Sequence, residues 1–217
     1  MPKDHGIGAS TKRREDVRFL TGAGNYTDDI NVHGQAYVHF LRSDVAHGRI
    51  TNIDTAAAAA MPGVVRIFTG ADFEGVGGLP CGWQGTDRFG EPMQEPPHPV
   101  LAQGKVRHVG DPIAAVVADS PEQARDAAEA IETDIEELPA VMNMKAALAD
   151  GAPKVHDDLK SNLCYDWGFV EDNREAVDKA IKEAAHVTTL ELVNQRLVAN
   201  PMEPRVAVGD YRRATDE

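Results

Sequence analysis

The sequence predicts an α+β fold in which β-strands alternate with helices and pack against them. Residues 120–131 have the strongest helix signal, because Ser120 is a good N-cap, Pro121 suits the first turn and Gln123 completes a capping box. An alanine-rich apolar stripe follows at helical spacing. Residues 112–118 before this helix and 133–137 after it have the composition of strands. Strand, helix and strand in succession indicate a layer of helix on sheet.

The elements before this unit follow the same pattern. Residues 13–20 favour a short helix, and a turn is expected at 27–29. Residues 36–41 alternate along the chain with apolar side chains on both faces, which predicts a buried strand. Alanines at 56–60 favour a helical turn, and the β-branched run at 64–68 predicts the next strand.

Residues 74–99 are rich in glycine and proline and poor in apolar side chains, which predicts a long irregular loop. Trp83 and Phe89 lie on this loop, and we expect their rings to pack against another surface. We expect the loop to line a substrate funnel or a subunit interface. A strand is predicted to follow at 100–109, before the turn at Gly110.

Residues 139–153 predict a connector with a short helix at 144–148 and a domain boundary near Gly151. Beyond it, Asp172 and Glu175 form a capping box for a helix whose inward face holds Val177 and Ile181. Three further strands are expected, at residues 163–169, 187–193 and 205–211. Because the last of these lacks a following partner strand, we expect the sequence to be part of a longer chain.

Composition excludes several classes of protein. Hydrophobic residues make up 42% and charged residues 26%, as in ordinary globular proteins. The net charge of −13 argues against a nucleic-acid partner, because binding to phosphates requires clustered cations. Cys81 and Cys164 match neither a metal motif nor a disulfide framework, which favours a reducing compartment. With no signal peptide and no transmembrane segment in the sequence, we expect a cytoplasmic protein.

Sequence motifs assign no catalytic, cofactor-binding or metal-ligating residue. Gly22 and Gly24 lack the strand and helix of a dinucleotide site, and the eight histidines show no ligand spacing. No nucleophile motif is present, which disfavours a small hydrolase. The proline-punctuated run at 194–205 has two interpretations. Either Glu203 forms an ion pair with Arg196 or Arg205, or the run is a rigid loop that supports a buried cofactor.

Several stretches in the same order resemble one enzyme family. They are residues 13–22 and 26–30, residues 41–43, 46–50 and 53–55, residues 61–65 and 69–72, residues 106–118, residues 138–141 and the run at 194–205. Together they resemble the large molybdopterin-binding subunit of the xanthine dehydrogenase, aldehyde oxidase and aerobic carbon monoxide dehydrogenase family.

The resemblance implies a flexible N-terminal arm at 1–15, an α/β hammerhead domain at 16–150 and the beginning of the molybdopterin-binding domain at 151–217. It implies a molybdenum hydroxylase whose molybdopterin has the cytosine dinucleotide form. The implied partners are an FAD-binding medium subunit and a 2Fe-2S small subunit, in a dimer of heterotrimers. In the family the catalytic residues lie beyond position 217, so the substrate stays open among carbon monoxide, an aldehyde and an N-heterocycle. A stand-alone, non-catalytic scaffold or assembly subunit is the alternative.

Overall fold

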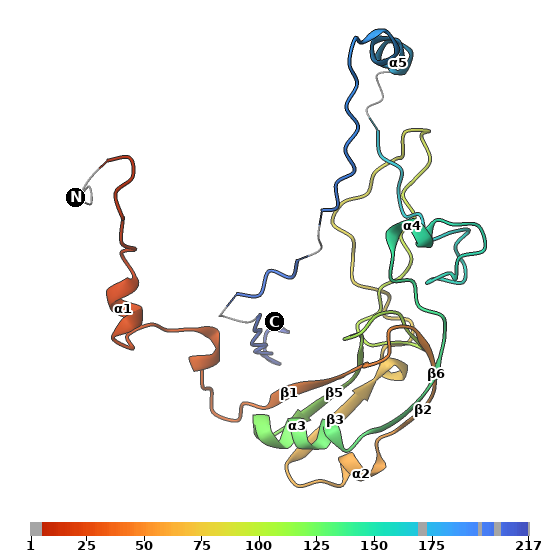
Figure 1. Ribbon diagram of the computed structural model, residues 1–217. Helices are drawn as coiled ribbons and strands as arrows, with labels where there is room; N and C mark the ends of the chain where they lie inside the picture. The colour runs from red at the N-terminus through yellow and green to blue at the C-terminus, as the bar shows by residue number, and fades with distance from the viewer. Residues whose placement is uncertain (1–5, 169–172, 195–196, 202–204, 217) are drawn as a thin grey trace. The chain divides into compact units, whose positions relative to one another are not determined.

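The computed structural model describes residues 6–168, 173–194, 197–201 and 205–216 (Figure 1). Its contacts divide the chain into two units, one made of Met1–Gln35 with Thr189–Glu217 and the other of Ala36–Thr188. The first unit holds the helix α1 (Asp16–Leu20) and the 3-10 turn η1 (Thr27–Asp29), which confirms both predictions for that segment. The second unit holds both β-sheets.

The first sheet has three antiparallel strands in the order β1 (Tyr37–Arg42), β5 (Pro112–Ala118) and β3 (Val64–Thr69). The central strand β5 is the most buried, as its almost continuous run of apolar residues requires. Val116 faces His39 of β1 and Ile67 of β3 across the two ladders. The prediction of a strand at 112–118 is confirmed.

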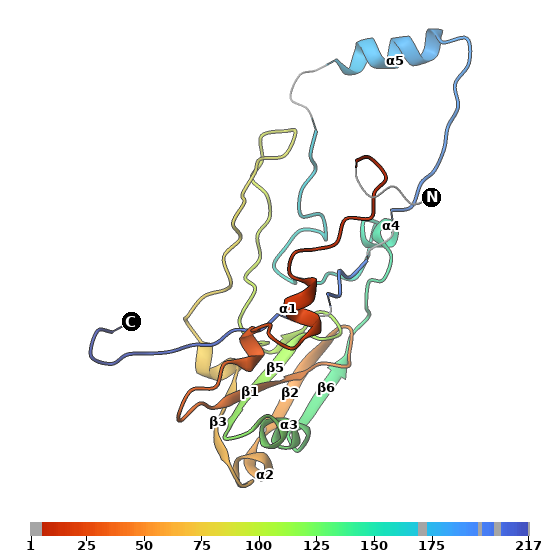
Figure 2. The same cartoon turned by 90° about the vertical axis from the view of Figure 1, so that its left-hand side faces the viewer.

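The helix α3 (Pro121–Glu129) packs on one face of this sheet (Figures 1 and 2). Its start is as predicted, because the Ser120 hydroxyl accepts a hydrogen bond of 3.2 Å from the backbone N–H of Gln123. Small side chains let the helix approach the sheet closely. A single buried cluster joins Ala127 and Ala128 to Val116 and to Ala58 of the short helix α2 (Ala56–Ala59).

The second sheet has the order β4 (Lys105–Val106), β2 (Gly48–Asp54) and β6 (Glu132–Glu137), and both pairings are antiparallel. Its central strand β2 was not predicted from the sequence. The register between β2 and β6 shifts between Ile50 and Asn52. This irregularity puts Ile50 and Ile53 against the same buried cluster, which breaks the alternation on which sequence analysis relies.

Leu41 and Ile53 pack against the buried residues of both sheets, so the second unit has one continuous core. The backbone after β3 and the backbone before β4 also approach each other closely. Gly70 opens the 3-10 turn η2 (Gly70–Phe73), and a Cβ at Gly70 would lie 2.3 Å from the carbonyl oxygen of Ala102. Glycine is therefore required at this position.

Four predicted strands are wrong over the residues that the structure describes. Of residues 100–109 only Lys105–Val106 is a strand, because Gly104 takes a left-handed φ of 66° directly before it. Residues 163–168, 187–193 and 205–211 have no strand structure. An alternating pattern of apolar residues indicates which face of a strand is buried. A strand also needs backbone hydrogen bonds to a partner strand, and these segments have no such ladder. Phe169 lies outside the described residues.

Two helices complete the second unit, α4 (Met144–Ala147) and α5 (Arg174–Glu183). Both were predicted. The Asn143 side chain caps α4 through the backbone N–H groups of Lys145 and Ala146. The proposed cap of α5 at Asp172 lies outside the described residues. Among the helices that the structure describes, none is long and apolar enough to cross a membrane.

Candidate functional site

Residues 78–99 form a long two-limbed segment, hereafter the hairpin, which Figure 2 shows in yellow and yellow-green. Isolated bridges join Gly78 to Pro99 and Thr86 to Pro92. Between them, the backbone N–H of Met93 donates to the Gly85 carbonyl at 2.9 Å. Prolines interrupt the pairing because they lack an N–H donor. The predicted irregular loop is thus a hairpin without a continuous ladder.

The tip of the hairpin is ordered by one carboxylate. Asp87 Oδ1 accepts hydrogen bonds from the backbone N–H groups of Phe89 at 2.8 Å and Glu91 at 2.9 Å. Gly90 takes a left-handed φ of 85°, which completes the tight turn. The ring of Phe89 is 75% exposed, so this turn presents an aromatic side chain to the surroundings.

The hairpin also contacts residues 163–168. The Trp83 and Tyr165 rings meet edge to face with centroids 5.5 Å apart. The backbone N–H groups of Arg88 and Gln94 each donate a 3.0 Å hydrogen bond to this segment, and Arg88 forms an ion pair with Asp166. Trp83 therefore finds the packing partner that sequence analysis expected, although it stays 59% exposed.

A cleft of about 200 Å³ lies at the base of the hairpin, hereafter the basal cleft. It is lined by Pro97, His98, Pro99, Ala102, Arg107, His108, Asp111, Val155 and His156. Asp111 is nearly buried and accepts a 2.8 Å hydrogen bond from the backbone N–H of Arg107. The Nε atom of Arg107 is buried and has no hydrogen-bond partner.

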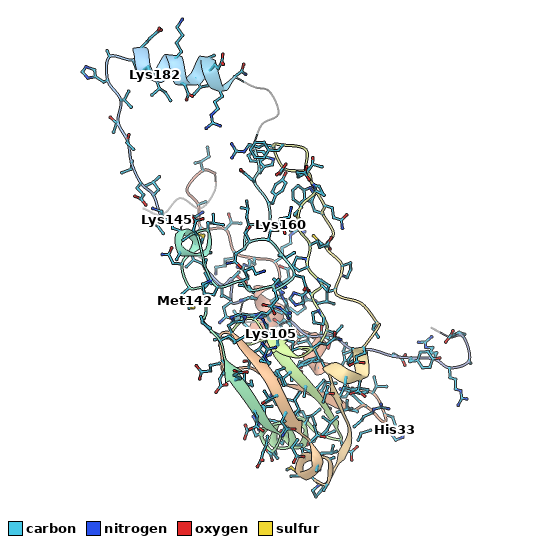
Figure 3. The ribbon with its side chains drawn as sticks, turned by 90° about the vertical axis from the view of Figure 1, so that its right-hand side faces the viewer. His33, Lys105, Met142, Lys145, Lys160 and Lys182 are labelled. Carbon is cyan, nitrogen blue, oxygen red and sulfur yellow. The ribbon has the colours of Figure 1, made fainter. Side chains whose placement is uncertain are left out.

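Lys105 lies in β4, next to the residues that line the basal cleft, and makes an ion pair there. Lys105 Nζ donates to Asp157 Oδ2 at 2.7 Å, and this hydrogen bond lowers the pKa of Asp157. The pKa of His156 is also lowered, first by its partial burial and then by the positive charges of Arg107 and Lys105. Figure 3 labels Lys105 near the end of the sheets. The cleft thus has the half-buried Arg107 in its lining, the buried Lys105 beside it, and a histidine whose lowered pKa favours the neutral ring.

His47 lies directly before β2 and is buried, only 6% exposed. Its Nδ1 lies 2.8 Å from the carbonyl oxygen of Pro139, which can only accept a hydrogen bond, so Nδ1 carries the proton. Its Nε2 is buried without a partner. The ring therefore anchors the chain that leaves the second sheet, after β6.

Histidine, cysteine, aspartate and glutamate do not form a group of three able to hold a metal ion in the described part of the chain. Cys81 and Cys164 are free and exposed. In the run at 194–205, Arg196 and Glu203 lie outside the described residues, so the suggested ion pair stays a prediction. The basal cleft could not be predicted from the sequence, because its lining comes from segments far apart in the chain and no motif connects them.

Comparison with known proteins gives the context of these features. The family described as "Aldehyde oxidase and xanthine dehydrogenase, a/b hammerhead domain" matches residues 21–139. The nicotine 6-hydroxylase large subunit of Paenarthrobacter nicotinovorans is 36% identical over 210 residues, which cover 97% of this chain and 25% of that protein. The carbon monoxide dehydrogenase large chain of Afipia carboxidovorans is 37% identical over 74% of this chain and 19% of its own length.

Solved structures agree with the sequence matches. The Cu,Mo-containing carbon monoxide dehydrogenase aligns with a TM-score of 0.63 at 32% identity, over 83% of this chain and 23% of its own. Quinoline 2-oxidoreductase from Pseudomonas putida 86 aligns with a TM-score of 0.58 at 40% identity, over 74% of this chain and 20% of its own. The chain therefore spans about a quarter or less of the length of these relatives.

Proposed function

Because this chain belongs to the aldehyde oxidase and xanthine dehydrogenase hammerhead family, we propose that it is part of the large subunit of a molybdenum hydroxylase. The match over residues 21–139 carries the proposal. It is supported by relatives named as large subunits of a nicotine hydroxylase and of carbon monoxide dehydrogenase. The proposed reaction is an oxidation at molybdenum, with a carbon monoxide, aldehyde or N-heterocyclic substrate.

Within that subunit, we propose that residues 16–150 are the hammerhead domain after a short arm at 1–15, and that 151–217 begin the molybdopterin-binding domain. The continuous core that Leu41 and Ile53 connect suits a supporting role, because a rigid body holds neighbouring domains in a fixed position. The role of this chain would be structural support for the cofactor domain and for subunit assembly.

The cofactor of the proposed enzyme is molybdopterin, which supplies the redox-active metal when it is bound. We propose the cytosine dinucleotide form. Among the described residues, the basal cleft has only about 200 Å³, which is too small for a pterin dinucleotide. We therefore derive no catalytic step from them.

The proposed partners are an FAD-binding medium subunit and a 2Fe-2S small subunit, in a dimer of heterotrimers in the cytoplasm. The hairpin is the candidate contact for one of these subunits or for the rest of the large subunit. Its exposed aromatics, Trp83 and Phe89, are of the residue types that interfaces favour.

Affinity purification of the native gene product through a tag after Met1 tests the proposal. We expect co-purification of flavin and iron-sulfur subunits, molybdenum in the purified complex, and dye reduction with one of the three substrate classes. Absence of molybdenum and of both partner subunits from the intact product would refute it.

Changes in the hairpin test its role within that complex. Trp83→Ala with Phe89→Ala should reduce the yield of assembled complex or its activity, because the exposed aromatic contacts are lost. The matched control is Val76→Ala, which removes an exposed apolar side chain before the hairpin. Unchanged assembly together with unchanged activity in the double variant would exclude the hairpin as an interface or a substrate funnel.

A further inference from the structure

We propose that the basal cleft binds a phosphate group, either as inorganic phosphate or as the phosphate of a small ester. This inference is independent of the proposed hydroxylase function, because it rests only on the residues that line the cleft. Three features support it: a buried donor without an acceptor, three histidines in the lining and a suitable space.

The donor is the guanidinium of Arg107. Its Nε is buried and unpartnered, while Nη1 donates to the Lys105 carbonyl oxygen at 3.4 Å. A buried donor that lacks an acceptor is costly, and such groups are rare in folded proteins. A phosphate oxygen would satisfy it, and the planar guanidinium suits an oxyanion with several acceptor atoms.

Three histidines line the same cleft from separate segments: His98 at the base of the hairpin, His108 after β4, and His156 in the connector. Imidazole N–H groups donate to phosphate oxygens whether the ring is neutral or charged. A tetrahedral oxyanion can accept from several directions at once, which favours phosphate over a planar carboxylate. The volume of about 200 Å³ leaves room for a small group attached to the phosphate.

The fixed charges in and beside the cleft balance each other. They are Arg107 and Asp111 in the lining and the pair Lys105 and Asp157 beside it. Lys105 is paired with Asp157, and Asp111 accepts from the backbone of Arg107 and lies 3.8 Å from His108 Nδ1. A bound phosphate would place negative charge beside His156, whose pKa is now lowered by its burial and by the charges of Arg107 and Lys105, and raised by that of Asp157. Binding of phosphate should therefore raise the pKa of His156.

A metal ion is the competing ligand for a cleft with histidines. Among the described residues, these side chains do not form a group of three that could hold one. The buried guanidinium of Arg107 also repels a cation. The anion is therefore the ligand that the cleft favours.

The test is a titration of the full chain with inorganic phosphate, followed by NMR of the histidine rings. We expect saturable shifts at His98, His108 and His156, a higher titration midpoint for His156, and no shift at His39 on β1. Arg107→Met should weaken phosphate binding by about tenfold or more, since a charge-assisted hydrogen bond is lost. The matched control, Arg66→Met, removes an exposed arginine on β3 and should leave binding unchanged.

Two further titrations distinguish the sources of the ligand. Glycerol phosphate that competes with inorganic phosphate supports the ester, whereas phosphate binding without such competition supports the free ion. Acetate that shifts the same rings with equal affinity would overturn the choice of phosphate. The proposal also fails if shifts do not saturate, or if Arg107→Met binds as wild type. If Arg107→Met does not fold, His98→Gln and His156→Gln provide the same comparison, and wild-type binding in both would overturn it.

Discussion

Lys105 Nζ lies 2.7 Å from Asp157 Oδ2, and the lysine is the buried member of the pair, with its side chain 9% exposed against 67% for the aspartate. Asp157→Asn should lower the melting temperature, because it leaves a buried ammonium without an anionic partner. Adding Lys105→Met should recover part of the loss by removing that charge. Thermal denaturation of both variants gives the order of their melting temperatures. A double variant less stable than Asp157→Asn would contradict the argument.

Stability should also fall in acid around His156. Its pKa in the folded chain is below the ordinary value of 6.5, so the unfolded chain binds the proton more readily. The contribution of the neutral ring is complete above pH 6.5 and declines as pH falls from there towards the lowered pKa. Urea denaturation at pH 7.5 and 5.5 measures this decline, and His156→Gln should show a smaller one. Equal declines in both proteins would rule out His156 as the cause.

The helix cap at Ser120 is open to a direct stability measurement. Ser120→Ala removes the acceptor for the Gln123 N–H and should cost about 1 kcal/mol of unfolding free energy. Ser120→Asp keeps an acceptor at the same position and should retain most of the stability. Chemical denaturation compares the three proteins. A cost for Asp as large as that for Ala would show that the cap does not act through its oxygen.

Gly70→Ala should destabilise the second unit by about 1–3 kcal/mol, because the new Cβ would meet the Ala102 carbonyl at 2.3 Å. Gly82→Ala is the matched control, since a Cβ there meets nothing within 4 Å. Its stability should equal or slightly exceed that of the wild type. Denaturation midpoints decide the comparison, and equal midpoints for the two variants would refute the steric explanation.

Trp83→Ala should release the hairpin from residues 163–168 without unfolding the sheets. The ring contact with Tyr165 is lost, so the amides of Arg88 and Gln94, which donate to that segment, should exchange hydrogen faster. Amides of β5 should keep their protection. Phe89→Ala is the control, because it removes another exposed aromatic ring of the hairpin and leaves the Trp83–Tyr165 contact in place. Unchanged exchange at Arg88 and Gln94 in Trp83→Ala would contradict the assignment.

The predictable parts of this fold are those with local signals. Ser120, Pro121 and Gln123 define the start of α3 through neighbours within one turn, and the apolar residues 112–118 define a strand buried on both faces. The resemblance of scattered stretches to molybdenum hydroxylases is supported by the family match at residues 21–139.

The features that could not be predicted from the sequence depend on contacts between distant residues. The irregular register at Ile50 concealed β2, and the segment at 163–168 has an alternating pattern without a strand ladder. The basal cleft forms where His98, Arg107 and His156 come together. The sequence around each of these residues does not indicate that they are close in space. Local propensity cannot specify such a site.

The strand order also determines when each strand can find its partner during synthesis. Strand β1 pairs with β5, residues 112–118, and β2 pairs with β6, residues 132–137. A ribosome adding roughly 5–20 residues per second therefore leaves both early strands without their main partners for several seconds. During that time their unpaired edges and apolar side chains are exposed to other nascent chains. The emerging chain is thus most prone to aggregation before residue 137 has appeared, and a chaperone that holds it over this interval should increase the folded yield.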